Sequence, residues 1–210
     1  MKTCQQSKNQ TIYKHGVSVK NYLFDLLNHL RGDQELKYEW KLPQWVYDEK
    51  DFILSNILDD EILELYTLYH DVGKPYCMTI DDDGGKHFPN HAEVSYKVFK
   101  SVFMDTDNVE DISQLIKRDM DFHLLKAKDL EEFSKTKYSI TLILSALSEI
   151  HSNAKMFGGL DSVSFKIKWK HTNKKGRQVI NLIKNNNNKN KNNNKNYDGY
   201  ENIRKIFKKM

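Results

Sequence analysis

Residues 61–75 read EILELYTLYHDVGKP and place a histidine beside an aspartate at the end of a helical pattern. Apolar residues recur at helical spacing up to Tyr69, and Gly73 and Pro75 then predict the end of the helix. His70 and Asp71 therefore lie on its last turn, where both side chains can face one ion. A histidine also suits the negative end of a helix dipole, so a polar helix end explains the pair equally well when it is taken alone.

Helical patterns fill most of the remaining chain as far as residue 160. The predicted helices cover residues 15–30, 91–103, 108–123, 128–135 and 138–157. The first of these ends near Gly32, and the last is the most apolar, so we expect it to be central and buried. A loop with aromatic residues at 33–47 and a turn-rich loop at 78–88 complete an all-α body of five or more helices.

The pattern changes after residue 160. In SVSFKIKWK, residues 162–170, apolar residues alternate with serine and lysine, which is typical of a strand, and QVINLI at 178–183 fits a partner strand. We predict a small basic β-hairpin over residues 161–183, with Lys166, Lys168 and Lys170 available to bind a polyanion. KNNNNKNKNNNKN at 184–196 predicts a disordered linker, and 197–210 a short basic helix.

Charge, hydrophobicity and cysteine content restrict which classes of protein this chain can belong to. The net charge of +4 divides into −7 over residues 1–160 and +11 over residues 161–210, so an acidic body precedes a basic end that suits phosphate-bearing partners. No apolar run approaches the roughly 18 residues of a membrane span, and no secretory signal is visible. The only cysteines, Cys4 and Cys77, are too few for a disulfide framework, so we expect a cytoplasmic protein with reduced thiols.

Four histidines lie at the ends of predicted helices, where loops can bring them together. They are His15, His70, His91 and His123, and Asp71 joins them. Imidazole and carboxylate form a mixed nitrogen and oxygen ligand set, which suits Mn²⁺, Fe²⁺, Ni²⁺, Zn²⁺ or Mg²⁺. The sequence therefore predicts one or two divalent metal ions as cofactor.

HDVGKP at 70–75, FPNHA at 88–92 and the histidine ending RDMDFH at 118–123 together resemble the HD-domain superfamily of metal-dependent phosphohydrolases. The HD domain attached to tRNA nucleotidyltransferases is the most similar type, and the resemblance covers about residues 12–157. It implies an HD-domain-like helical bundle over residues 1–160.

The resemblance also implies roles for individual residues. His15, His70 and Asp71 would bind one metal, while His91 and His123 would bind a second metal or contact the substrate phosphate. Asp71 could also orient or deprotonate the attacking water. Lys74 would balance negative charge on the phosphate.

One position departs from the family pattern. The family closes its metal shell with an aspartate in a late helix, and the corresponding segment LSALSEIHSNAKMF contains none. Glu149, His151 and Asn153 are the candidates to replace it, and the sequence does not choose among them.

The resulting hypothesis is a metal-dependent enzyme that cleaves phosphomonoester or phosphodiester bonds, cyclic or linear, in nucleotides or RNA ends. A deoxynucleotide triphosphohydrolase or nucleotidase is the enzymatic alternative. The missing aspartate supports a third reading, in which a non-catalytic module of the same fold binds RNA or another polyanion. The basic end is expected to contact RNA, and the oligomeric state stays open.

Overall fold

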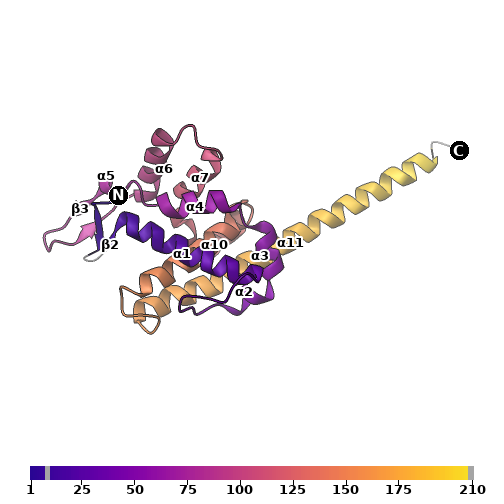
Figure 1. The fold of residues 1–210 in the computed structure, drawn as a ribbon. Helices are drawn as coiled ribbons and strands as arrows, with labels where there is room; N and C mark the ends of the chain where they lie inside the picture. Colours follow the sequence, from indigo (N-terminus) through magenta and orange to yellow (C-terminus); the bar gives the residue numbers. More distant parts are fainter. Residues whose placement is uncertain (8–9, 208–210) are drawn as a thin grey trace.

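Three helices in contact form the centre of the protein (Figure 1). The structure is a computed structural model that describes the backbone of residues 1–7 and 10–207, and the side chains of the same residues as far as 188. Helix α1 (Ile12–Arg31) packs against both α4 (Asp60–Tyr69) and α10 (Ser139–Ala154). The expected all-α body is therefore confirmed.

Helix α1 begins and ends at residues suited to those positions. The Thr11 side chain accepts a hydrogen bond from the backbone N–H of Lys14 at 3.2 Å, which caps the first turn. Gly32 takes the left-handed conformation with φ of 88° and ends the helix as the sequence predicts. These ends place His15 in the first turn, where α1 meets α4.

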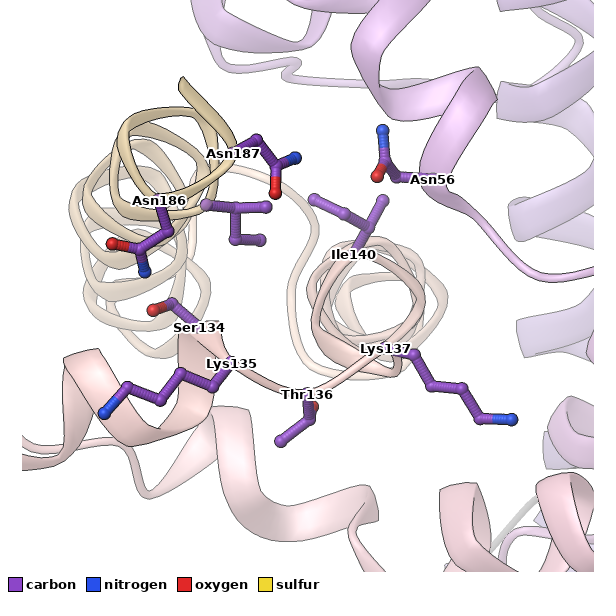
Figure 2. Close-up of a pocket in the computed structure, with 9 residues that line it drawn as sticks. Asn56, Ser134, Lys135, Thr136, Lys137, Ile140, Asn186 and Asn187 are labelled. Atoms are coloured by element: carbon purple, nitrogen blue, oxygen red, sulfur yellow. The ribbon is translucent and has the colours of Figure 1, made fainter. Parts of the chain in front are cut away.

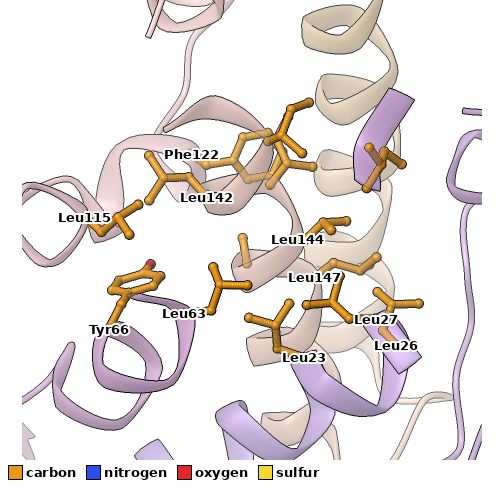
Figure 3. Packing of buried hydrophobic residues seen from close by; sticks show 14 of the residues in the cluster. Leu23, Leu26, Leu27, Leu63, Tyr66, Leu115, Phe122, Leu142, Leu144 and Leu147 are labelled. Atoms are coloured by element: carbon orange, nitrogen blue, oxygen red, sulfur yellow. The ribbon is translucent and has the colours of Figure 1, made fainter. Parts of the chain in front are cut away.

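The core lies between α1, α4 and α10, as Figure 3 shows. Leu23 and Leu27 of α1 meet Leu63 of α4 and Leu147 of α10, and all four side chains are fully buried. Each such leucine contributes about 1.5–3 kcal/mol by leaving water. Helix α10 is buried along almost its whole length, as expected from its apolar sequence.

Shorter helices and two small hairpins surround this centre. The helices are α2 (Gln44–Asp48), α3 (Lys50–Asn56), α5 (Lys74–Cys77), α6 (His91–Val102), α7 (Val109–Lys117), α8 (Asp119–His123), a 3-10 turn η1 (Ala127–Asp129) and α9 (Leu130–Ser134). Strands β1 (Gln5–Ser7) and β2 (Gln10–Thr11) pair antiparallel, as do β3 (Thr79–Ile80) and β4 (Lys86–His87). The helix expected over 108–123 is divided at Arg118 into α7 and α8.

The predicted β-hairpin at 161–183 is wrong. Helix α11 (Val163–Phe207) occupies this segment and continues through the expected linker at 184–196 into the expected short helix, as Figure 1 shows in orange to yellow. Phe165, Thr172 and Val179 are buried and recur at helical spacing, because α11 packs against α9 and α10. Packing over this longer period outweighs the short alternation at 162–170. Residues 208–210 lie outside the described residues.

The loop between α1 and α2 is held by one buried carboxylate. Asp25 of α1 accepts hydrogen bonds from the backbone N–H groups of Lys37 and Tyr38 and from Nε1 of Trp40, at 2.9 to 3.2 Å. The Trp40 ring then lies 4.5 Å from the ring of His151 on α10. Across the described part of the chain, no helix is long and apolar enough to span a membrane.

Candidate metal centre

A close approach of two helices brings the first histidine to the second. Gly16 follows His15 on α1, and a Cβ atom there would overlap the backbone carbonyl of Leu68 on α4. Because glycine has no Cβ, α1 and α4 can approach closely here, and the ring centroids of His15 and His70 lie 5.2 Å apart. Both histidines are buried.

The turn after α4 fixes His70 and brings α6 to the site. Nδ1 of His70 lies 2.8 Å from the carbonyl oxygen of Thr67, which can only accept, so Nδ1 donates and Nε2 is the ring atom left facing Asp71. The backbone N–H of Gly73 donates to Oγ of Ser95 on α6 at 2.9 Å. His91 lies one turn before Ser95, and its Nε2 reaches 3.7 Å from Oδ1 of Asp71.

Helix α10 supplies a carboxylate to the same place. Potential ligand atoms of His15, His70 and Glu149 all lie within 4.8 Å of one another. Oε1 of Glu149 is 3.7 Å from Nε2 of His15, and Oε2 accepts a hydrogen bond from Nε2 of His123 at 2.8 Å. Asp71 adjoins this cluster, with Oδ2 3.3 Å from Nε2 of His70 and 3.7 Å from Nε2 of His15.

Several polar atoms at the centre lack a hydrogen-bond partner among the described residues. They are both ring nitrogens of His15, Nε2 of His70 and Oδ1 of Asp71, and all are buried. Buried polar atoms without partners are rare because losing water costs them free energy. Metal-binding histidines commonly donate their other ring N–H to a backbone carbonyl, as His70 does here. The residues therefore fit a divalent cation held by nitrogen and oxygen.

The electrostatics of the centre favour a cation. Burial alone would raise the pKa of the Asp71 carboxyl, but the charges of His70 and Lys74 hold it far below its usual range. Burial likewise opposes protonation of His70, yet the carboxylates of Asp71 and Asp119 raise its pKa to about 10. The pKa of Glu149 is lowered because His123 and His15 outweigh its burial. The same carboxylates would attract a divalent ion, whose binding to His70 would displace this proton.

The family model for the HD domain matches residues 13–154, more than half of the 210 residues. This chain belongs to the HD-domain family. Members of the family are metal-dependent phosphohydrolases as a class, and the buried histidine and carboxylate cluster of this HD-domain protein agrees with that chemistry. No curated protein and no solved structure matches the chain.

Of the three candidates for the missing aspartate, Glu149 is the one whose side chain lies in the cluster of this HD-domain protein. His151 points elsewhere. Its Nδ1 donates to the carbonyl of Leu147 at 2.7 Å, and its Nε2 accepts from the backbone N–H of Lys41 at 3.0 Å. Both ring nitrogens are therefore occupied, and burial lowers the pKa of His151 to about 4. The side chain of Asn153 lies at the edge of the site, with Nδ2 3.4 Å from Oε1 of Glu149.

The remaining predicted site residues divide into two groups. His91 and His123 border the cluster and keep 18% and 21% of their side chains exposed, so both rings are partly open to solvent. Lys74 is buried, and its ammonium group lies 2.6 Å from Oδ2 of Asp71, so it balances that carboxylate directly.

The three lysines expected to share one face of a strand are separated by the helix. Lys168 lines a cavity together with His123 and Glu149. Lys166 and Lys170 line a different surface groove beside Trp169. Only Lys168 is therefore placed beside the metal centre.

A separate cavity of about 340 Å³ lies between the α9–α10 junction and α11 (Figure 2). Asn56, Asn186 and Asn187 line it, and it contains none of the predicted site residues. In Figure 2 the side chains of Lys135 and Lys137 extend away from its centre. Lys137 pairs with Asp111 instead, at 2.7 Å, so this cavity is not the candidate site.

One buried acid beneath the site, Asp119, is not among the residues predicted from the sequence. Asp119 accepts a hydrogen bond from the hydroxyl of Tyr66 at 2.7 Å, and both residues are buried. Burial and this carboxylate raise the pKa of Tyr66 well above its usual value, so the hydroxyl stays protonated and donates. Tyr66 precedes His70 by four residues, and Asp119 precedes His123 by four, so helical spacing contained the signal.

Proposed function

We propose that the protein is a metal-dependent phosphohydrolase that cleaves phosphate esters of nucleotides or RNA ends. The observation that carries the proposal is the largely buried cluster of His15, His70 and Glu149 next to Asp71, in which both ring nitrogens of His15, Nε2 of His70 and Oδ1 of Asp71 lack a hydrogen-bond partner among the described residues. The motifs HDVGKP and FPNHA favour the reaction type of HD domains attached to tRNA nucleotidyltransferases.

His15, His70 and Glu149 would hold the metal, with Asp71 beside them. When bound, a divalent ion polarises a phosphoryl oxygen and lowers the pKa of a coordinated water towards neutrality. Asp71 would orient that water through Oδ1, because its Oδ2 already accepts from Lys74.

The exposed edge of the site suits an anionic substrate. His91 and His123 present partly exposed imidazoles on two sides of the cluster, where they can donate hydrogen bonds to phosphoryl oxygens. Glu149 holds the orientation of His123 through the 2.8 Å hydrogen bond. The chain would thus supply metal ligands, a group that orients water and phosphate contacts within one centre.

The test combines metal analysis with a substrate screen. The purified chain is analysed for bound transition metal and assayed with Mn²⁺, Ni²⁺ or Mg²⁺ on 2′,3′-cyclic nucleotides, nucleoside monophosphates and deoxynucleoside triphosphates. We expect bound metal, opening of the cyclic phosphate or release of phosphate, and loss of both metal and activity in His70→Ala and Asp71→Ala. Release of inorganic triphosphate would select the triphosphohydrolase alternative. Absence of metal and of all hydrolysis would leave only a binding module.

A second candidate function concerns the basic end of the chain. Residues 161–210 hold 14 lysines and arginines against 3 acids, and α11 extends away from the body in Figure 1. Such a charged helix supports contact with RNA as a polyanion. Deleting residues 185–210 keeps the Lys184–Glu49 ion pair and should weaken RNA binding and its salt dependence while mononucleotide hydrolysis stays the same. Unchanged RNA affinity would contradict this role.

A further inference from the structure

A cavity lies beside the candidate metal centre, where it shares Glu149, and α11 forms one of its walls. The α11 pocket has a volume of about 350 Å³ and is lined on one side by His123 and Glu149 and on the other by Lys168 and His171. Helix α11 begins at Val163, beyond residues 13–154 that match the HD-domain model. The wall is therefore supplied by a part of this chain outside the family match.

The part of α11 that forms the wall is fixed in place by contacts with the helical body. Nε2 of His171 lies 3.1 Å from the backbone carbonyl oxygen of Phe122, the residue before His123. Phe165 is buried with its ring 5.0 Å from that of His151, and Nε1 of Trp169 donates to the carbonyl of Lys41. Side chains on a packed helix hold a more definite position than side chains on a loop. Lys168 is thus presented to the pocket by a rigid element.

The lining combines a cation with apolar side chains. Lys168 makes no ion pair with any described residue, whereas its neighbour Lys166 pairs with Asp161 at 3.1 Å. Ile150 and Ile167 contribute apolar surface to the same cavity. A positive group beside a metal cluster suits a phosphate, and the apolar side chains suit a sugar or base.

The size of the pocket limits the ligand. Small-molecule sites occupy roughly 300–1,000 Å³, and about 350 Å³ lies near the lower end of that range. One nucleotide unit fits this volume, while a nucleic-acid strand would have to lie outside it. The lining, a cation beside apolar side chains, favours a nucleoside phosphate over a bare phosphate ion.

We propose that the α11 pocket binds one nucleoside phosphate, with its phosphate between the metal cluster and Lys168 and its nucleoside against Ile150 and Ile167. This proposal rests on the proposed function and names the substrate class of the same site. It also assigns to α11 the role of selecting the substrate.

Equilibrium binding to the full chain in the presence of Mn²⁺ tests the proposal. The probes are adenosine 5′-monothiophosphate, which resists hydrolysis, adenosine and inorganic phosphate. The wild-type chain should bind the monothiophosphate more tightly than either fragment. Lys168→Glu should weaken monothiophosphate binding about tenfold or more, because it replaces an attractive charge with a repulsive one, and should change adenosine binding less than twofold.

Lys174→Glu is the matched control, since Lys174 is exposed on the same helix and does not line the pocket. It should change monothiophosphate affinity less than twofold. Equal weakening by both variants, no effect of Lys168→Glu, or no binding by the wild-type chain would each overturn the proposal. Metal content and hydrolysis are measured on the same samples. If the protein binds metal and turns over substrate but Lys168→Glu has no effect, only the pocket proposal is refuted. If the variants show the predicted binding pattern but the protein has no bound metal and no turnover, only the proposed hydrolase activity is refuted.

Discussion

Replacing Glu149 by glutamine tests the metal centre most directly. The change removes the negative charge near Nε2 of His15 but keeps a carbonyl oxygen that can accept from His123. The hydrogen bond to a charged acceptor becomes a bond to a neutral one, which costs the metal-free protein about 1 kcal/mol. The fold should therefore survive, and the larger effect should appear when metal is added.

The size of that effect follows from linkage. A ligand present at 100 times its dissociation constant stabilises the folded state by about 2.7 kcal/mol. For a chain of this size each kcal/mol shifts the melting temperature by about 2–4 °C, so metal should raise it by about 5–11 °C. Loss of an outer-shell partner weakens metal affinity by up to roughly 100-fold, and loss of a ligand by at least as much. At the same metal concentration Glu149→Gln would then gain only about 0.4 kcal/mol, or about 1 °C.

Differential scanning fluorimetry with and without Mn²⁺ measures both melting temperatures. Glu131→Gln is the control, because this exposed glutamate of α9 loses the same charge far from the cluster and should keep the full metal shift. A full shift in Glu149→Gln would refute the placement of Glu149 as a ligand. An equal loss of shift in both variants would show that only the overall charge matters.

Four further outcomes follow from the packing. His151→Leu should lower stability by about 1–3 kcal/mol, because the N–H of Lys41 loses its acceptor, yet keep the metal-induced shift in the same thermal assay. The pKa of His151 is about 4 in the folded chain against an ordinary 6.5, so the unfolded chain binds more protons between these values. Stability should fall by up to about 3 kcal/mol as pH drops from 6.5 to 4, and urea titrations should show a smaller fall in His151→Leu. Gly16→Ala should cost about 1–3 kcal/mol in urea and weaken Mn²⁺ binding by calorimetry, because its Cβ pushes α1 from the carbonyl of Leu68. Asp25→Ala should cost about 2–4 kcal/mol by urea denaturation through its lost hydrogen bonds, while metal content stays unchanged.

Local signals in the sequence were sufficient for the helical body. Gly32 ends α1 in the left-handed conformation, which glycine adopts without strain, so this helix end depends on one residue. Local signals do not show which of Glu149, His151 and Asn153 replaces the missing aspartate. Positions 149 and 153 share one face of a helix and 151 lies on the other, so periodicity separates them into two sets. Only the packing of α10 shows which face meets His15 and which meets Trp40.

The segment after residue 160 shows how a short window misleads. Val163, Phe165, Ile167 and Trp169 alternate as in a strand, yet Val163 and Ile167 are 75% and 64% exposed in the helix. The decisive residues lie further along, where Gly176 packs on the Trp45 ring and Val179 and Ile180 are buried. A strand would have placed Lys166, Lys168 and Lys170 on one basic face. In a helix, side chains two positions apart point about 200° away from each other. Lys168 therefore lines the cavity beside the metal centre, while Lys166 and Lys170 line a different groove. The two secondary structures therefore predict different mutant phenotypes. On a strand the three lysines would form one polyanion-binding surface, whereas on the helix Lys168 alone makes the proposed phosphate contact.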